Sequence, residues 1–237
     1  MLRSILPVLH KTMPVTRSSL ARSKKSSTPN STPSRHAMTS SSSKRAPPAS
    51  AKPKPAAPHP NDDLSYPYYF FYGHAASNPT GALSQWHLTS FTEGPHTFTT
   101  AEHYMMYHKA MLFEPAAAPA ILAAPGPREA KALGRKVANF SPKTWEARCD
   151  AIVEQGNYLK FTQNPDAWAV LSPARTGTKA LVEAAARDAI WGIGMGWERA
   201  RGREAQWGQN RLGKALTRVR ARIVAERDEA ANGSKVV

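Results

Sequence analysis

The sequence predicts a mainly α-helical domain with a few short β-strands, preceded by a disordered basic tail. Between about residues 100 and 225, successive segments begin at a capping residue or at a proline that suits the first helical turn. An aromatic run at 66–72 and the pair Gly94-Pro95 are typical of a buried strand and a hairpin. Residues 14–60 hold almost no large apolar side chains, so burial cannot offset the entropy cost of ordering them.

The length of 237 residues suits one domain and a tail, which we place at 66–225 and 1–65, with a second disordered segment at 226–237. The formal net charge is +15, and residues 1–60 contribute eleven Lys and Arg but no Asp or Glu. The rest of the chain has 21 basic against 17 acidic residues, a net charge of +4. The net positive charge therefore lies mainly in the tail, and it is weak evidence that the folded part binds nucleic acid.

Cysteine count and hydropathy limit the class of protein. Cys149 is the only cysteine, so no intrachain disulfide forms and a cysteine zinc site is excluded. A reducing, intracellular compartment is the natural inference, either cytoplasmic or nuclear. No apolar run approaches the roughly 18 residues that a membrane span needs, so we expect no membrane partner.

The N-terminal segment is compatible with three alternatives, two targeting signals and a tail without any signal. Residues 1–23 are apolar and basic without an acid, which fits a mitochondrial transit peptide, although Pro7 and Pro14 interrupt the helix that such a peptide forms. Lys24-Lys25 and Lys44-Arg45 are short clusters that suit nuclear entry. A solvated tail with no address is the third alternative, and its charge would favour anionic partners.

The folded part is expected to begin with extended segments. The run at 66–72 predicts a buried strand or extended segment, which Gly73 ends. A short extended or irregular piece follows at 82–87. A small hairpin then spans 91–98 around Gly94-Pro95.

Helices dominate the rest of the domain. The first is expected at 100–113, and prolines at the first helical position start the next three at 127–137, from 142, and from 165 to before 173. The helix from 142 has a core face formed by Trp145, Cys149, Ile152, Val153 and Leu159. The remaining elements are a short strand at 180–184, a strand or tight loop at 190–194, and a last helix from about Asn210.

Two charged residues on one helical face give the first candidate site. Thr99 is a good N-cap, and Glu102, three residues later, can complete a capping box. At about 100° per residue, Glu102, Met106 and Lys109 fall on nearly one face. A carboxylate and an ammonium two turns apart would line a pocket. The alternative is that Glu102 only caps the helix and Lys109 is solvated.

The segment from Asp188 to Gly194 gives the second candidate. Asp188 precedes Trp191 by three residues, and two glycines follow, so the backbone can approach a ligand while the indole offers a stacking face. Together with Glu102, the Asp188 carboxylate would suit general acid–base work on a polar bond. The alternative is a polar residue at a strand entry beside a core tryptophan.

The third candidate is the helix start at 207–216. Glycines flank it, and it carries Asn210, Arg211 and Lys214, which suit phosphate groups at a helix N-terminus. The glycine spacing matches neither the P-loop nor the dinucleotide fingerprint, so no standard nucleotide-binding fold is expected. The alternative is an ordinary capped amphipathic helix.

Taken in order, these stretches resemble the NADAR (NAD- and ADP-ribose-associated) family, also called the YbiA-like domain. The resemblance covers about residues 68–220 and rests on the ordered set of motifs rather than on any one of them. The matching stretches are Phe71-Tyr72-Gly73-His74, Leu83-Ser84-Gln85-Trp86-His87, Thr100 to Ala110, Ala132 to Val137, Trp145, Gly156 to Phe161 with Gln163-Asn164, Leu181 to Ala184, Asp188 to Gly194, and Gly208 to Leu216.

The resemblance implies a compact, mainly helical domain with N-glycosidase activity, which hydrolyses the bond between a base or amine and a ribose phosphate. It implies two substrate classes, reactive early intermediates of the riboflavin pathway and ADP-ribose attached to guanine bases. In the second class, nucleic acid would be the modified substrate. No metal or redox cofactor is implied, and His103 and His108 lie five residues apart on different helix faces, which argues against a metal site.

Family roles carry over to residues of the candidate sites. The resemblance assigns them to Glu102, Asp188 and Trp191, implicates Trp145, and identifies Lys109 as the lysine of the same helix as Glu102. The further expected contacts to phosphate or ribose are Arg135, Asn210 and Gly73. The sequence differs from many members at Met105-Met106, at Ser84-Gln85-Trp86 and at Leu171-Ser172-Pro173, and these differences bear on substrate choice.

The chemistry agrees with these residue types. Cleavage of a ribosyl C–N bond passes through an oxocarbenium-like state, which Glu102 or Asp188 would stabilise directly or by activating water. Lys109 would bind phosphate, donate a proton, or attack the opened ribose C1 to give a Schiff base. Trp145 and Trp191 would stack on the base. The alternatives are a non-catalytic ADP-ribose- or nucleotide-binding module and a general nucleic-acid-binding protein that acts through the tail.

Overall fold

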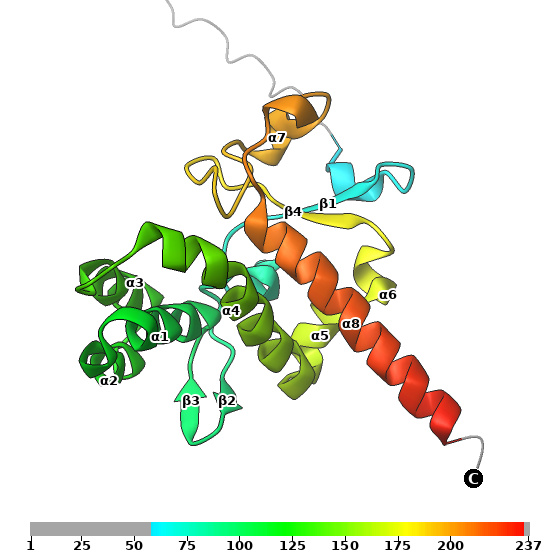
Figure 1. The fold of residues 1–237 in the computed structure, drawn as a ribbon. Coiled ribbons are helices and arrows are strands. Elements are labelled where there is room, and N and C mark those ends of the chain that lie inside the picture. The colour runs from blue at the N-terminus through cyan, green and yellow to red at the C-terminus, as the bar shows by residue number, and fades with distance from the viewer. Residues whose placement is uncertain (1–57, 235–237) are drawn as a thin grey trace, which may run out of the picture. The chain divides into compact units, whose positions relative to one another are not determined.

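A computed structural model describes residues 58–234 as a mainly helical domain with two pairs of short strands (Figure 1), which confirms the predicted fold class. The strands are β1 (Tyr68–Phe71), β2 (Phe91–Glu93), β3 (His96–Phe98) and β4 (Ala180–Glu183). The helices are α1 (Ala101–Phe113), α2 (Ala118–Leu122), α3 (Pro127–Lys136), α4 (Pro142–Gln163), α5 (Pro165–Leu171), α6 (Pro173–Thr176), α7 (Trp197–Ala200) and α8 (Arg211–Gly233). Of the helices in the described range, none is long and apolar enough to cross a bilayer.

The N-terminal boundary of regular structure lies before the predicted position. Residues 1–57 and 235–237, which include most of the predicted tail and its candidate targeting signals, lie outside the described part. A 3-10 turn at Pro60–Asp62 already precedes β1. It is fastened there because the Asn61 side chain accepts from the Phe70 N–H at 2.7 Å and donates to the Phe70 carbonyl at 2.9 Å.

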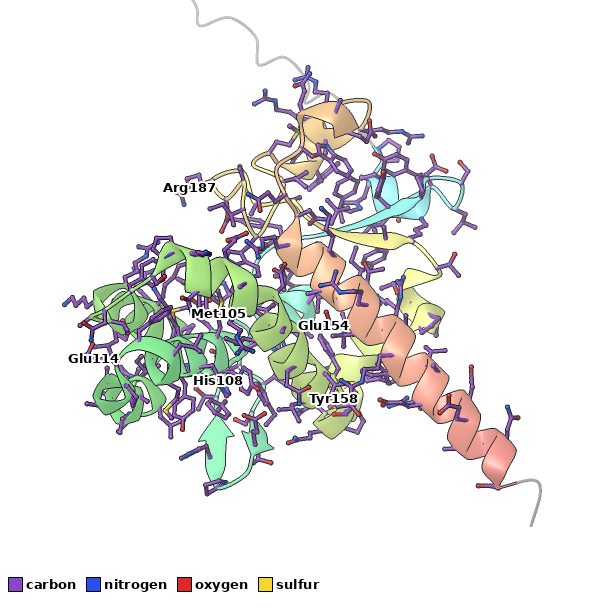
Figure 2. The ribbon with its side chains drawn as sticks, in the orientation of Figure 1. Met105, His108, Glu114, Glu154, Tyr158 and Arg187 are labelled. Carbon is purple, nitrogen blue, oxygen red and sulfur yellow. The ribbon has the colours of Figure 1, made fainter. Side chains whose placement is uncertain are left out.

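At the other end, α8 continues to Gly233, beyond the boundary predicted at residue 225. Two contacts hold this part of the helix against its neighbours. The Tyr158 hydroxyl of α4 donates to Glu226 at 2.8 Å, and the Arg227 guanidinium lies 4.3 Å from the centre of the Trp168 ring (Figure 2 shows Tyr158). Such long-range contacts are invisible in the local charge pattern, which had suggested a fraying end.

The strands β1 and β4 form a parallel pair in which Phe71 lies opposite Glu183. Alternate residues face opposite sides, so Tyr69 joins the large helical core while Phe70 packs with Val182 in a second cluster. Both faces of β1 are therefore covered. This explains why the predicted strand is a continuous aromatic run rather than an alternation of apolar and polar residues.

Helix α1 lies at the centre of the helical layer and contacts α2, α3 and α4 (Figure 1). Two glycines allow the close approach. A Cβ on Gly134 of α3 would collide with Met106, and a Cβ on Gly156 of α4 would collide with Tyr104. Helix α8 packs against both β4 and α4, so it joins the strand pair to the helical layer.

The predicted hairpin is confirmed as β2 and β3, but the helix cap differs from the prediction. Thr100, not Thr99, is the N-cap of α1, and its hydroxyl accepts from the His103 N–H at 3.3 Å. Thr99 lies between β3 and the helix, and its carbonyl accepts from the Thr89 N–H, which precedes β2. Glu102 is therefore the second helical residue, and the capping box predicted from Thr99 and Glu102 is wrong.

Candidate active site

A cleft of about 720 Å³ opens where the two parallel strands end beside α1 and α3. Its volume is in the range of small-molecule sites. The carboxyl ends of parallel strands are a common ligand position, because the chain leaves the sheet there and exposes loop side chains. The lining residues are Tyr72, Gly73, His74, Ala75, Asn78, Ser84, Gln85, Trp86, Glu102, Met105, Met106, Lys109, Lys131, Arg135, Trp145, Glu183, Ala185, Arg187, Asp188, Trp191 and Leu212.

Seven of the eight predicted site residues line this cleft, although they come from distant parts of the chain. They are Gly73, Glu102, Lys109, Arg135, Trp145, Asp188 and Trp191. The helical spacing placed Glu102, Met106 and Lys109 on one face, and all three do line the cleft. Gly73 ends β1 with φ +85°, a left-handed conformation that glycine adopts readily.

Glu102 is the most buried acidic residue of the cleft, with 4% of its surface exposed. Burial raises the pKa of its carboxyl, whereas Lys131, the Trp86 side chain and Arg135 act against that rise. The nearby Asp188 carboxylate adds to it. The first turn of α1 also brings the positive end of the helix dipole to this carboxylate. Glu102 is therefore held in a charged and largely dry environment.

Asp188 shapes the loop that follows β4. Its Oδ1 accepts from the backbone N–H groups of Ile190 at 2.9 Å and Trp191 at 2.8 Å. The same side chain thus lines the cleft and holds the turn that carries the indole. Residues 190–194 form a loop rather than a strand, which settles the alternative left open by the sequence. Arg187 extends outward from this loop (Figure 2).

The second and third candidate segments form one assembly. The backbone N–H groups of Arg211 and Leu212, at the start of α8, donate to the carbonyls of Ile190 and Trp191 at 3.2 and 3.0 Å. These donors are therefore not available to a phosphate group, unlike those of a free helix N-terminus. The expectation of a phosphate site at the start of α8 is corrected accordingly.

Asn210, the eighth predicted residue, does not line the cleft. Its Oδ1 accepts from the Glu183 N–H at 3.0 Å, and its Nδ2 donates to the Leu181 carbonyl at 2.9 Å. The side chain is used in joining α8 to β4, and the residue is 8% exposed. Asn210 is a structural joint, so its predicted role as a substrate contact is corrected.

Arg211 supports the cleft from behind. It forms ion pairs with Glu146 at 2.5 Å and Asp150 at 2.7 Å. Its guanidinium also lies 5.4 Å from the centre of the Trp191 ring, whose indole lines the cleft. These contacts fix the orientation of the indole. The two ion pairs also neutralise the Arg211 guanidinium, which the sequence had suggested as a phosphate contact.

Lys109 lies against aromatic rings. Its Nζ is 4.3 Å from the centre of the Phe140 ring and 5.7 Å from that of Trp145. Burial, and then the Arg135 charge, lower the pKa of Lys109. Glu102 and Lys109 share the cleft as predicted, but the cations that favour an ionised Glu102 come from α3.

Several lining residues were not identified as site residues from the sequence. Glu183 is the most informative, since burial, followed by the Asp188 charge, raises its pKa to about 7. Lys131 from α3 and Trp86 also line the cleft, with the Lys131 Nζ 5.7 Å from the Trp86 ring centre. The position of Glu183 at the carboxyl end of a buried strand was the one available signal.

A buried lysine stabilises the cleft wall. Lys160 is fully buried, and its Nζ donates to the Ser84 carbonyl at 2.9 Å. Burial lowers its pKa to about 7. Among residues 58–234, no cluster of three His, Cys, Asp or Glu side chains is placed to hold a metal ion.

Comparisons with known proteins agree on one family. The model of the NADAR domain matches residues 70–224. A protein named N-glycosidase R617, from Acanthamoeba polyphaga mimivirus, is 40% identical over 163 residues, which span 65% of this chain and 94% of that protein. N-glycosidase Npun_R5314 from Nostoc punctiforme is 34% identical over 127 residues, 53% of this chain and 74% of that protein.

A further relative and a solved structure extend the comparison. Protein irg-1 from Caenorhabditis elegans is 34% identical over 147 residues, which span 59% of this chain and 68% of that protein. The fold is similar to the NMR structure of the E. coli protein YbiA, with a TM-score of 0.55 and 26% identity. That similarity covers 68% of this chain and 88% of YbiA.

Proposed function

This chain belongs to the NADAR domain family, and from that premise we propose that its cleft is the active site of an N-glycosidase. Two relatives carry that activity in their names, which places the chain among hydrolases of N-glycosyl bonds. The proposed substrate has a base or amine joined through nitrogen to a ribose phosphate or to ADP-ribose. The candidate classes are ribosylamino-pyrimidine phosphates of the riboflavin pathway and ADP-ribosylated guanine.

The observation that carries the proposal is the combination of groups in one cleft. Carboxylates from Glu102 and Asp188 lie with the cations Lys131 and Arg135 and with indole rings such as Trp191. Carboxylates stabilise an oxocarbenium-like ribosyl group, cations bind phosphate, and indoles stack on a base. The three parts of the proposed substrate thus each have a matching group in the same cleft.

The proposed reaction is addition of water at ribose C1 with departure of the base. As the C–N bond lengthens, positive charge develops on the ribose, and Glu102 and Asp188 supply the facing negative charge. Water bonds to C1 and gives a proton to one of these carboxylates, while the C–N electron pair leaves with the nitrogen. Trp145 and Trp191 hold the base for departure.

Lys109 has a separate place in this proposal. Its lowered pKa makes the neutral amine available nearer to neutral pH than in an ordinary lysine. A neutral amine can attack the aldehyde of an opened ribose and form a Schiff base with loss of water. Its position beside Trp145 also suits phosphate or base contacts.

The test uses the full chain as wild type, Glu102→Gln and the control Glu154→Gln. Glu154 is paired with Arg218 at 2.6 Å between α4 and α8 and does not line the cleft. Each protein is incubated with a guanine-ADP-ribosylated oligonucleotide and with the ribosylamino-pyrimidine phosphate, and products are followed by mass spectrometry. Glu102→Gln should lower kcat/KM by about 10² to 10⁴.

The outcomes separate the proposal from its alternative. Release of base or amine by the wild type and the control establishes the hydrolase and identifies its substrate class. Saturable binding of ADP-ribose without release supports the non-catalytic binding module instead. Full activity in both Glu102→Gln and Asp188→Asn, with the fold intact, would refute the roles of these carboxylates.

A further inference from the structure

Glu183 lines the cleft with both of its backbone groups hydrogen-bonded, while its side chain forms no hydrogen bond or ion pair with any residue in the range 58–234. Its N–H donates to the Asn210 Oδ1 and its carbonyl accepts from the Ile193 N–H, both at 3.0 Å. The neighbouring strand places the uncharged Phe71 opposite it, and α8 faces it with the neutral Asn210 amide. The half-buried carboxyl lines the cleft.

The charges around Glu183 disfavour its ionised form. Burial and then Asp188, from the following loop, raise its pKa to about 7, and Glu102 from α1 adds to the rise. Lys131 from α3 acts in the opposite direction. Three carboxyl groups thus share the cleft with the basic side chains Lys109, Lys131, Arg135 and Arg187, of which Lys131 is the one that lowers the pKa of Glu183. Neighbouring carboxyl groups of this kind retain a proton on one member.

Glu183 is better suited than Glu102 to hold that proton. Burial raises the pKa of both carboxyl groups, but Glu102 sits in the first turn of α1, where the helix dipole favours a carboxylate. Lys131, the Trp86 side chain and Arg135 all lower the pKa of Glu102, whereas only Lys131 among them lowers that of Glu183. Glu102 is also only 4% exposed, whereas Glu183 is half-buried and can exchange its proton with water. Environments that give two carboxyl groups different pKa values are a common basis for distinct acid and base roles.

We propose that Glu183 donates the proton to the leaving nitrogen, an inference that rests on the proposed N-glycosidase function. As the C–N bond breaks, its electron pair passes to the nitrogen, which takes the proton from the Glu183 carboxyl. Water forms the new bond to ribose C1, keeps one proton as the new hydroxyl group and loses the other to Asp188 or Glu102. Exchange with bulk water then returns a proton to Glu183 and removes one from the other carboxyl, so the net reaction consumes one water molecule.

The test compares leaving groups in the full chain carrying Glu183→Gln, with Glu154→Gln as the matched control. One substrate is whichever of the two N-glycosides the wild type hydrolyses. The other is 4-nitrophenyl ribofuranoside 5-phosphate, whose nitrophenolate departs without a proton. Glu183→Gln should lower kcat/KM by about 10² to 10⁴ on the N-glycoside, the usual contribution of a general acid, and by less than about 10-fold on the nitrophenyl substrate.

The pH profile gives an independent readout. A proton donor works only while protonated, so wild-type kcat/KM on the N-glycoside should fall as pH rises above about 7, and Glu183→Gln should lose that decline. Both the ratio of the two substrates and the shape of the profile are insensitive to the fraction of folded protein. Equal losses on both substrates, or an alkaline decline that persists in Glu183→Gln, would overturn the inference.

The same experiment distinguishes this inference from its premise. A wild type that hydrolyses an N-glycoside, together with an unchanged profile in Glu183→Gln, overturns the role of Glu183 alone. A wild type that hydrolyses neither N-glycoside overturns the proposed function and this inference with it.

Discussion

Replacement of Asn210 tests whether the start of α8 is a structural joint. The side chain accepts from the Glu183 N–H and donates to the Leu181 carbonyl, in a residue that is 8% exposed. Asn210 also adopts φ +50°, a left-handed conformation that asparagine tolerates better than alanine. Asn210→Ala therefore removes two buried hydrogen bonds and adds backbone strain, whereas Asn210→Gly removes the bonds without the strain.

The magnitude follows from these two contributions. A buried backbone group left without its partner costs about 1–3 kcal/mol. A left-handed conformation costs an alanine roughly 1–2 kcal/mol. In the lower half of these ranges, two backbone groups without partners cost about 3 kcal/mol together, and the strain of an alanine costs about 1 kcal/mol. The free energy of unfolding should therefore fall by about 4 kcal/mol for Asn210→Ala and by about 3 kcal/mol for Asn210→Gly, which carries no strain. Against a typical domain stability of about 5–15 kcal/mol, either change is large.

Urea unfolding of the full-length variants measures both losses, and the expected order of stability is wild type, Asn210→Gly, then Asn210→Ala. An alanine variant within about 1 kcal/mol of the wild type would refute the hydrogen-bond reasoning, since each buried backbone group that loses its partner should cost at least that much. A glycine variant no more stable than the alanine variant would refute the strain reasoning. Unchanged stability with a raised KM would restore Asn210 as a substrate contact.

Two lysines with lowered pKa values, Lys160 and Lys109, give two further predictions. The pKa of Lys160 is lowered to about 7, below its unfolded value, so the unfolded chain binds more protons and stability should rise as pH increases from about 7 towards 10. Lys160→Met should remove that rise; urea unfolding at several pH values measures it, and an unchanged slope would contradict it. Borohydride added during turnover should trap a covalent adduct on Lys109 that Lys109→Arg lacks, and an intact-mass spectrum without any adduct would exclude the Schiff base.

The local pattern predicted the individual elements because their causes are local. Prolines in the first helical turn fix φ, and so the starts of α3, α4 and α5 agree with the prediction. The cap of α1 does not, because the Thr99 carbonyl accepts from the N–H of Thr89, a residue ten positions earlier in the chain, and the local pattern does not show this contact. The same reason explains why α8 passes residue 225, where contacts with α4 and α5 hold it.

The candidate site shows the same division. Glu102 and Lys109 share a face because the helical repeat puts them there, and the ordered motifs pointed to the family. Of the eight site residues predicted in this way, seven line the cleft. Asn210 was misassigned since its amide could equally bind a phosphate or a backbone, and only the packing of α8 on β4 shows which.

The sequence by itself determined the helical class, the element boundaries marked by proline and glycine, and the family. These depend on backbone conformation and on residue order. Only the tertiary structure decided that Glu183 joins Glu102 and Asp188, and that Lys131 rather than Lys109 is the leading cation acting on Glu102. The physical reason is that burial and Coulomb interaction depend on distance in space, and residues 102, 131 and 183 become neighbours only when the strands, α1 and α3 pack together.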